Sequence, residues 1–127
     1  MRKSHNQVEG VPAAVGPYSI AVSATNLLFT SGQLPLDPAT GALVGDTVAQ
    51  QAKQVLENLK AIVEKLGSNM EDLVKVSVYL TDMGAFSEFN DVYAGYFKKN
   101  YPARSCVEVS KLPKGAQIEI EAVAFKR

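Results

Sequence analysis

The segment 104–109 (RSCVEV) combines residue types that a purely structural strand does not need. Strand alternation would place Arg104, Cys106 and Glu108 on one face of the segment. Arginine is suited to hold a carboxylate, because its planar guanidinium forms two parallel charge-assisted hydrogen bonds. A surface arginine beside a buried thiol gives the same pattern and is the commoner arrangement. Taken alone, the segment leaves both interpretations of Arg104 open.

The single cysteine, Cys106, could be a nucleophile or a small buried apolar residue. The only histidine is His5, so neither a Cys-His nor a Ser-His-Asp arrangement is expected, and a buried thiol is the preferred interpretation. One cysteine and one histidine do not by themselves supply the four ligands of a tetrahedral zinc site. Acid–base chemistry would then fall to a carboxylate, a tyrosine, a lysine or bound water.

Two carboxylates, Glu119 and Glu121, share one face of a predicted strand near the end of the chain. As a pair they could carry out general acid–base chemistry. They could equally form a solvated strand face, and the alternation does not choose between the two.

A sheet is needed to position these residues, and five segments have the composition of strands. The predicted strands are 18–23, 27–31, 74–80, 104–109 and 116–125. Thr25-Asn26 is predicted to be the turn of a hairpin between the first two. The segment 113–115 (PKG) is the turn before the last strand.

Two helices are predicted between the strands. In the first, Thr47 with Gln50 matches a capping box at the start, and Gly67 matches the position after the last turn. Ser68 with Glu71 has the form of a second capping box, opening a short helical turn. The second helix covers 84–99. Its aromatic residues share one face and are interpreted as core packing: Phe86, Phe89, Tyr93, Tyr96 and Phe97.

The resulting order, β-β-α-β-α-β-β, predicts one α+β domain over 1–127. Its mixed sheet would carry both long helices on one face. The last strand is apolar on one side, while its other side mixes apolar and charged residues. We therefore expect the uncovered sheet face to meet another copy of the chain.

The bulk properties restrict the class of protein. Lys plus Arg number 13 and Asp plus Glu number 13, so the neutral chain gives no sign of nucleic-acid binding. No apolar run is long enough to span a bilayer, and the N-terminal segment lacks the apolar core of a signal peptide. A single cysteine suits a reducing compartment, so we expect a cytoplasmic protein.

Four separated motifs resemble those of a known family. They are 16–19 (GPYS), 30–35 (TSGQLP), 102–109 (PARSCVEV) and 112–115 (LPKG), the last leading into 118–122 (IEIEA). In this order they resemble the Rid family of reactive intermediate deaminases, also called the YjgF family and formerly the L-PSP endoribonucleases. The RSCVE segment is similar to the RidA subgroup. The resemblance runs over nearly the whole chain.

The resemblance implies a chorismate-mutase-like α+β fold, assembled as a homotrimer with active sites between subunits. The implied reaction is hydrolysis of 2-aminoacrylate, 2-iminobutyrate and related enamine or imine acids to 2-keto acids and ammonia. Such a 2-iminobutanoate/2-iminopropanoate deaminase would need no cofactor and no metal. Two alternatives remain, namely an endoribonuclease or translation inhibitor, and a non-catalytic regulator that binds small carboxylates.

The resemblance also assigns roles to residues. Arg104 would clamp the substrate carboxylate, and Glu119 rather than Glu121 would orient the attacking water. Cys106 would contribute its main chain and part of the pocket wall, and would not act as a covalent nucleophile.

Four further positions are implied to lie at the substrate. Tyr18 and Ser31 would line the cleft, with the backbone of Gly32 beside them. Asn90 matches a polar position near the cleft, although a solvated helix residue remains a close rival interpretation.

Overall fold

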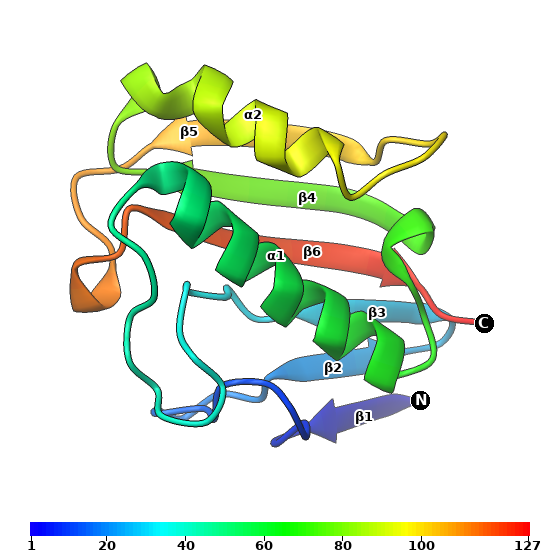
Figure 1. Ribbon diagram of the computed structural model, residues 1–127. Coiled ribbons are helices and arrows are strands. Elements are labelled where there is room, and N and C mark those ends of the chain that lie inside the picture. The colour runs from blue at the N-terminus through cyan, green and yellow to red at the C-terminus, as the bar shows by residue number, and fades with distance from the viewer.

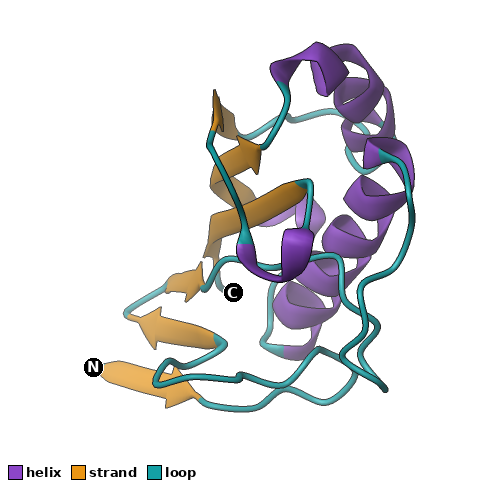
Figure 2. Ribbon diagram, turned by 90° about the vertical axis from the view of Figure 1, so that its left-hand side faces the viewer, coloured by secondary structure: helices purple, strands orange, loops and turns teal.

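The computed structural model describes residues 1–127 as one six-stranded sheet with two helices packed on one of its faces (Figure 1). The strands are β1 (Arg2–His5), β2 (Ala21–Ala24), β3 (Leu27–Thr30), β4 (Leu73–Leu80), β5 (Ala103–Glu108) and β6 (Ile118–Phe125). The helices are α1 (Val48–Lys65) and α2 (Phe86–Ala94), and short 3-10 turns cover Met70–Asp72, Met83–Ala85 and Pro113–Gly115. Seen edge-on, the helices lie on one side of the sheet and its other side is bare (Figure 2). The predicted mixed α+β sheet with both helices on one face is confirmed.

The strand order is β1-β2-β3-β6-β4-β5, and β4 and β5 are the parallel pair among antiparallel neighbours. Although β5 and β6 follow one another in the chain, β4 lies between them. The helix α2 connects β4 to its parallel neighbour β5, as a crossover requires. This crossover places α2 over the strand that carries Arg104.

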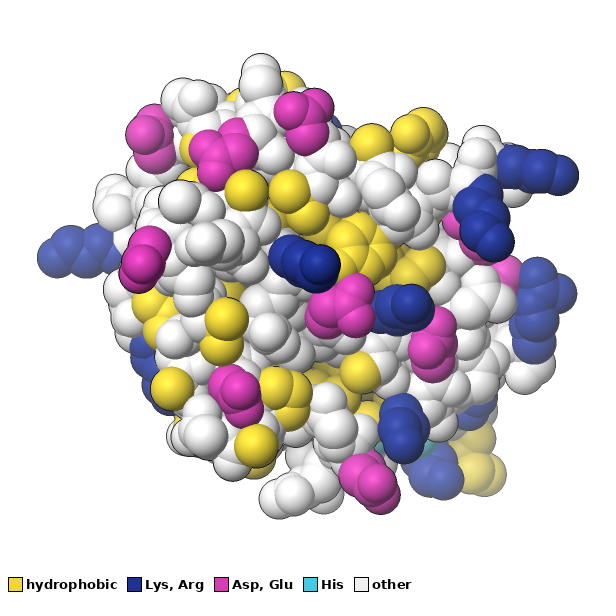
Figure 3. Space-filling model, viewed as in Figure 1, with side chains coloured by type: hydrophobic (Ala, Val, Ile, Leu, Met, Phe, Trp, Pro, Cys, Tyr) yellow, Lys and Arg dark blue, Asp and Glu magenta, His cyan; other side chains and the backbone are white.

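The core lies between the helices and the sheet. On β6 the helix-facing residues Ile118, Ile120, Ala122 and Ala124 are all buried, as the alternation predicted. The capping box of Thr47 and Gln50 is present at the start of α1, and Gly67 follows the helix with a φ of 90°. The helix-covered side mixes Lys and Arg with Asp and Glu, without a single-sign patch (Figure 3).

The structure differs from several of the predicted elements. The strand β1 was missed because its four residues, RKSH, are mostly exposed and show no apolar alternation. The strand predicted from Tyr18 begins only at Ala21. The helix α2 ends at Ala94 and not near Lys99, because Gly95 caps it and the amide of Lys98 donates to Glu71 Oε2 at 3.0 Å.

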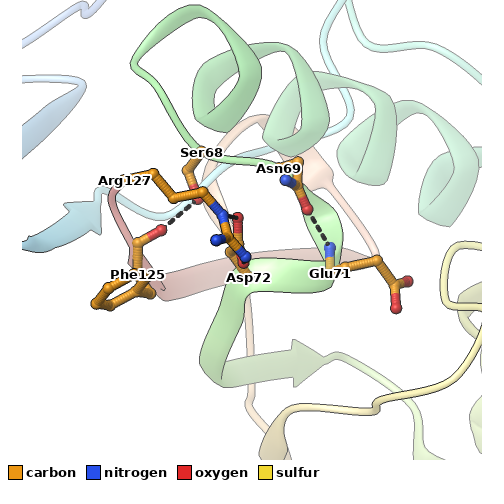
Figure 4. Close-up of polar contacts among 6 residues, drawn as sticks. All are labelled: Ser68, Asn69, Glu71, Asp72, Phe125 and Arg127. Carbon is orange, nitrogen blue, oxygen red and sulfur yellow. Dashed lines mark hydrogen bonds and ion pairs between the residues drawn. The ribbon is translucent and has the colours of Figure 1, made fainter.

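The predicted capping box of Ser68 is also absent. Asn69 caps the 3-10 turn by accepting a hydrogen bond from the amide of Glu71, while the Ser68 hydroxyl donates to the carbonyl of Phe125 (Figure 4). Arg127 forms an ion pair with Asp72 at 2.8 Å in the same region. These contacts tie the end of β6 to the start of β4.

Neither α1 nor α2 combines the length and the apolar composition that a membrane-spanning helix requires.

Candidate functional site

Arg104 lies on the helix-covered side of β5, beneath α2. It is paired with Val76 of β4, whose side chain is fully buried on that side. The guanidinium carbon lies over three aromatic rings of α2, at 4.8 Å from the ring centroid of Tyr93, 5.3 Å from Phe89 and 5.6 Å from Phe86. These separations are within the range of cation–π attraction.

The guanidinium of Arg104 has no ionic partner within the chain. The one ion pair of the structure joins Arg127 to Asp72. Glu108, which sequence alternation placed on the same face, instead accepts a hydrogen bond from the amide of Met83 at 2.8 Å. The N–H donors of Arg104 are therefore available to an external anion.

A depression of about 330 Å³ opens beside Arg104. It is lined by Asn90, Tyr93, Ala94, Tyr101, Pro102 and Arg104. Its wall is largely aromatic and apolar, with one cation, one amide and the phenol groups of two tyrosines as polar groups, which is the usual composition of a small-molecule pocket. Asn90 and Arg104 were both predicted site residues, and the structure places them in one pocket.

Tyr93 lies between Arg104 and the core. Its side chain is 4% exposed and its hydroxyl has no hydrogen-bond partner. Burial raises the pKa of Tyr93 to about 12, against the opposing effect of Arg104. The phenol is therefore protonated at neutral pH and is a potential donor.

Cys106 follows Arg104 on the same face of β5 and packs against the core. Burial raises the pKa of the Cys106 thiol, although the Arg104 charge acts in the opposite direction. The only histidine, His5, forms a 2.8 Å hydrogen bond with Ser23 on the β1–β2 pair and does not activate the thiol. At neutral pH Cys106 is a neutral thiol and a poor nucleophile.

Glu119 belongs to a second group of residues, on the uncovered side of the sheet. It is paired with Tyr79 of β4 and lies against Gly32, where any side chain would collide with the Glu119 carboxylate. Partial burial, and then the negative charge of Glu121, raise the pKa of Glu119 above its usual value. Of the two carboxylates, only Glu119 combines this shift with a contact to a predicted site residue.

Tyr18 and Ser31 belong to this second group. Tyr18 and Gly32 line a small depression of about 70 Å³. The Ser31 hydroxyl donates to the carbonyl of Ser19, and the Ser31 amide donates to the carbonyl of Ile20 at 2.8 Å. These bonds fix the segment that leads into Gly32.

The two groups face opposite sides of the sheet. Arg104 and Cys106 are paired with residues of β4 that are buried under the helices, whereas Glu119 lies opposite Tyr79 on the bare side. In addition, β4 separates β5 from β6. One chain therefore does not bring Arg104 and Glu119 together.

Sequence reasoning missed the contact between Arg104 and the aromatic residues. The spacing of Phe86, Phe89 and Tyr93 showed that they share a helix face, and core packing is correct for the buried Phe89 and Tyr93. The parallel β4–α2–β5 crossover could have predicted this contact, because it places the aromatic face of α2 over β5.

Comparisons with known proteins give consistent results. The sequence model of the family described as endoribonuclease L-PSP matches residues 9–126. A RutC family protein of Pyrococcus horikoshii is 52% identical over 118 residues, which cover 93% of this chain and 94% of that protein. The 2-iminobutanoate/2-iminopropanoate deaminase of Escherichia coli K12 is 48% identical over 122 residues, which cover 94% of each. The crystal structure of E. coli TdcF with bound serine is similar with a TM-score of 0.92 and 41% identity, over 98% of this chain and 100% of that one.

Proposed function

Because the chain belongs to the Rid family, whose sequence model is described as endoribonuclease L-PSP, we propose that it is a hydrolytic deaminase of reactive 2-enamine and 2-imine acids. The substrates would be 2-aminoacrylate, 2-iminobutyrate and their relatives, and the products 2-keto acids and ammonia. The observation that carries the proposal is the unpaired guanidinium of Arg104 in a small aromatic pocket.

The relatives support this choice of substrate. Some carry the name 2-iminobutanoate/2-iminopropanoate deaminase, while others are named only as RutC family proteins. The TdcF structure holds serine, which presents the same carboxylate next to a nitrogen-bearing carbon.

The chemistry requires little from the protein. A protonated imine carbon is already electrophilic, so the site mainly has to hold the acid and place a water molecule. Arg104 would bind the carboxylate through its two parallel donors. Glu119, with its raised pKa, would accept a proton from the water as the oxygen bonds to the imine carbon. Glu119 would then return that proton to the nitrogen of the carbinolamine. As the carbon–nitrogen bond breaks, the hydroxyl oxygen would form the carbonyl and give up its remaining proton to Glu119, so that ammonia and the 2-keto acid leave.

The placement of these two residues supports an assembly in which they meet across a subunit boundary. Arg104 and Glu119 face opposite sides of the sheet in one chain, so we propose a homotrimer in which each site joins Arg104 of one subunit to Glu119, Tyr18, Ser31 and Gly32 of the next. The bare sheet face exposes large apolar side chains, including Phe29 at 41%, Val107 at 47% and Phe125 at 39%. Such a face is typical of a surface between subunits. A cytoplasmic location belongs to the same proposal and is supported by the unpaired thiol of Cys106.

A coupled assay tests the activity. Threonine dehydratase generates 2-iminobutyrate, and the appearance of 2-ketobutyrate is followed with and without the protein. The wild-type chain should accelerate this step, and Arg104→Ala and Glu119→Ala should not. If neither the wild type nor the variants accelerate the reaction, the proposed deaminase activity is rejected. Retention of product binding in Glu119→Ala without any wild-type acceleration would favour a binding module.

A further inference from the structure

We infer that Phe86, Phe89 and Tyr93 form an aromatic cage that positions the guanidinium of Arg104 for carboxylate binding, an inference that rests on the proposed function. The three rings come from two successive turns of α2, and their centroids lie 4.8 to 5.6 Å from the guanidinium carbon of Arg104. No carboxylate of the chain is paired with this cation.

The kind of partner determines what Arg104 can still bind. A carboxylate partner would occupy the N–H donors at the edge of the guanidinium and would compete with the substrate. Aromatic rings attract the cation through their faces and accept none of its in-plane hydrogen bonds. The cage therefore orders a long, flexible side chain while leaving its hydrogen-bond donors free. Because the side chain is already ordered, substrate binding costs less conformational entropy.

The packing of α2 shows that the cage is held firmly. Phe89 is fully buried and Tyr93 is 4% exposed. The rings continue as a stack, with 5.4 Å between the centroids of Phe89 and Tyr93 and 4.9 Å between those of Tyr93 and Phe97. Phe97 extends the stack, but its ring is not one of the three in cation–π range of the guanidinium. It is therefore a matched control within the same structural unit.

Fluorination of Phe86 tests the cage without changing its shape. Phenylalanine carrying one, two or three ring fluorines is introduced at position 86, because each fluorine weakens the attraction of the ring face for a cation. The dissociation constant of 2-ketobutyrate, measured by calorimetry, should rise stepwise and reach roughly two- to fivefold with three fluorines. KM should rise in parallel while kcat stays constant, because the cage affects binding and not the chemical step. The same series at Phe97 should give a flat response.

A spectroscopic measurement supplies an independent criterion. The Nε–H resonance of Arg104 should be shifted by the ring currents of the cage. It should move toward the position of a free arginine in Phe86→Leu and stay in place in Phe97→Leu. A flat fluorine series at Phe86, an equal response at Phe97, or an unshifted Arg104 resonance would each overturn the cage. If Arg104→Ala still binds the product, the proposed carboxylate clamp is refuted. The Arg104 resonance alone would then test whether the aromatic cage contacts the guanidinium.

Discussion

At the scale of single residues, Arg104 is distinguished by the groups that do not contact it. Its charge lies over aromatic rings and its hydrogen-bond donors are unused within the chain. A surface arginine would be surrounded by water, and a structural one would have a carboxylate beside it. In the structure, Arg104 is half-buried over these rings and lines a pocket, and its role in binding substrate is the proposal made above.

Replacing Arg104 tests the two-donor geometry. Arg104→Lys keeps the charge but loses the planar fork, so one of two charge-assisted bonds should be lost. Because such a bond contributes about 1.5–3 kcal/mol, KM for the imine acid should rise roughly ten- to hundredfold in the coupled assay. Arg104→Ala should be weaker still. An unchanged KM in Arg104→Lys would show that a positive charge alone is sufficient to bind the substrate carboxylate.

The raised pKa of Glu119 predicts a pH dependence. In the proposed mechanism the carboxylate of Glu119 is the active form, so activity should fall as the pH drops through its pKa. This acid limb should lie above the pH expected for an ordinary glutamate. In Glu121→Gln one negative neighbour is removed, which lowers the pKa of Glu119 and moves the limb to lower pH. Glu119→Gln should reduce kcat by about 10²–10⁴ at pH values above the acid limb, and the limb itself should disappear. If Glu121→Gln leaves the limb in place, another group controls it.

At the scale of elements, sequence patterns predicted the features that depend on residues close together in the chain. The capping box of α1 and the alternation of β6 are confirmed, because each depends on residues only two or three positions apart in the chain. The family resemblance is confirmed as well. The polar edge strand β1 escaped prediction because its pairing with β2, from Arg2 opposite Ala24 to His5 opposite Ala21, joins distant parts of the chain. The same is true of the pocket, whose aromatic wall and arginine meet only through tertiary packing.

The loop after β3 offers a test at this scale. Asn58 of α1 is 1% exposed, and its amide donates to the carbonyls of Leu34 and Leu36 at 3.1 and 3.0 Å. Asn58→Leu has a similar volume but leaves both carbonyls without this donor, so the free energy of unfolding should fall by about 2–3 kcal/mol. Urea unfolding measures this change. Gln54→Leu removes only the partly exposed bond to Asn58 and should cost at most about 1 kcal/mol. Equal losses in both variants would contradict the role given to Asn58.

At the scale of the whole molecule, the sheet separates the two groups of site residues. Arg104 lies under the helices and Glu119 lies on the bare face. The sequence alone placed both on strands but not on opposite sides of one sheet, because alternation gives relative faces only within a strand.

Mixing two inactive variants tests the proposed assembly. Arg104→Ala and Glu119→Ala chains are coexpressed in equal amounts, and each alone should be inactive. If every site takes Arg104 from one subunit and Glu119 from the next, about a quarter of the sites in randomly mixed trimers are intact. The mixture should therefore recover about a quarter of the wild-type rate. Light scattering should give a trimer mass, and no recovery in mixed trimers would place both residues in one chain.

The division of the site by the sheet has a consequence for the cell that makes this protein. In the proposed assembly, a newly synthesised chain carries both halves of the chemistry and can use neither. Protection against reactive imines would then begin only when chains meet, and would grow more steeply than their concentration. A cell that halves its synthesis of the protein near the assembly threshold would lose more than half of that protection.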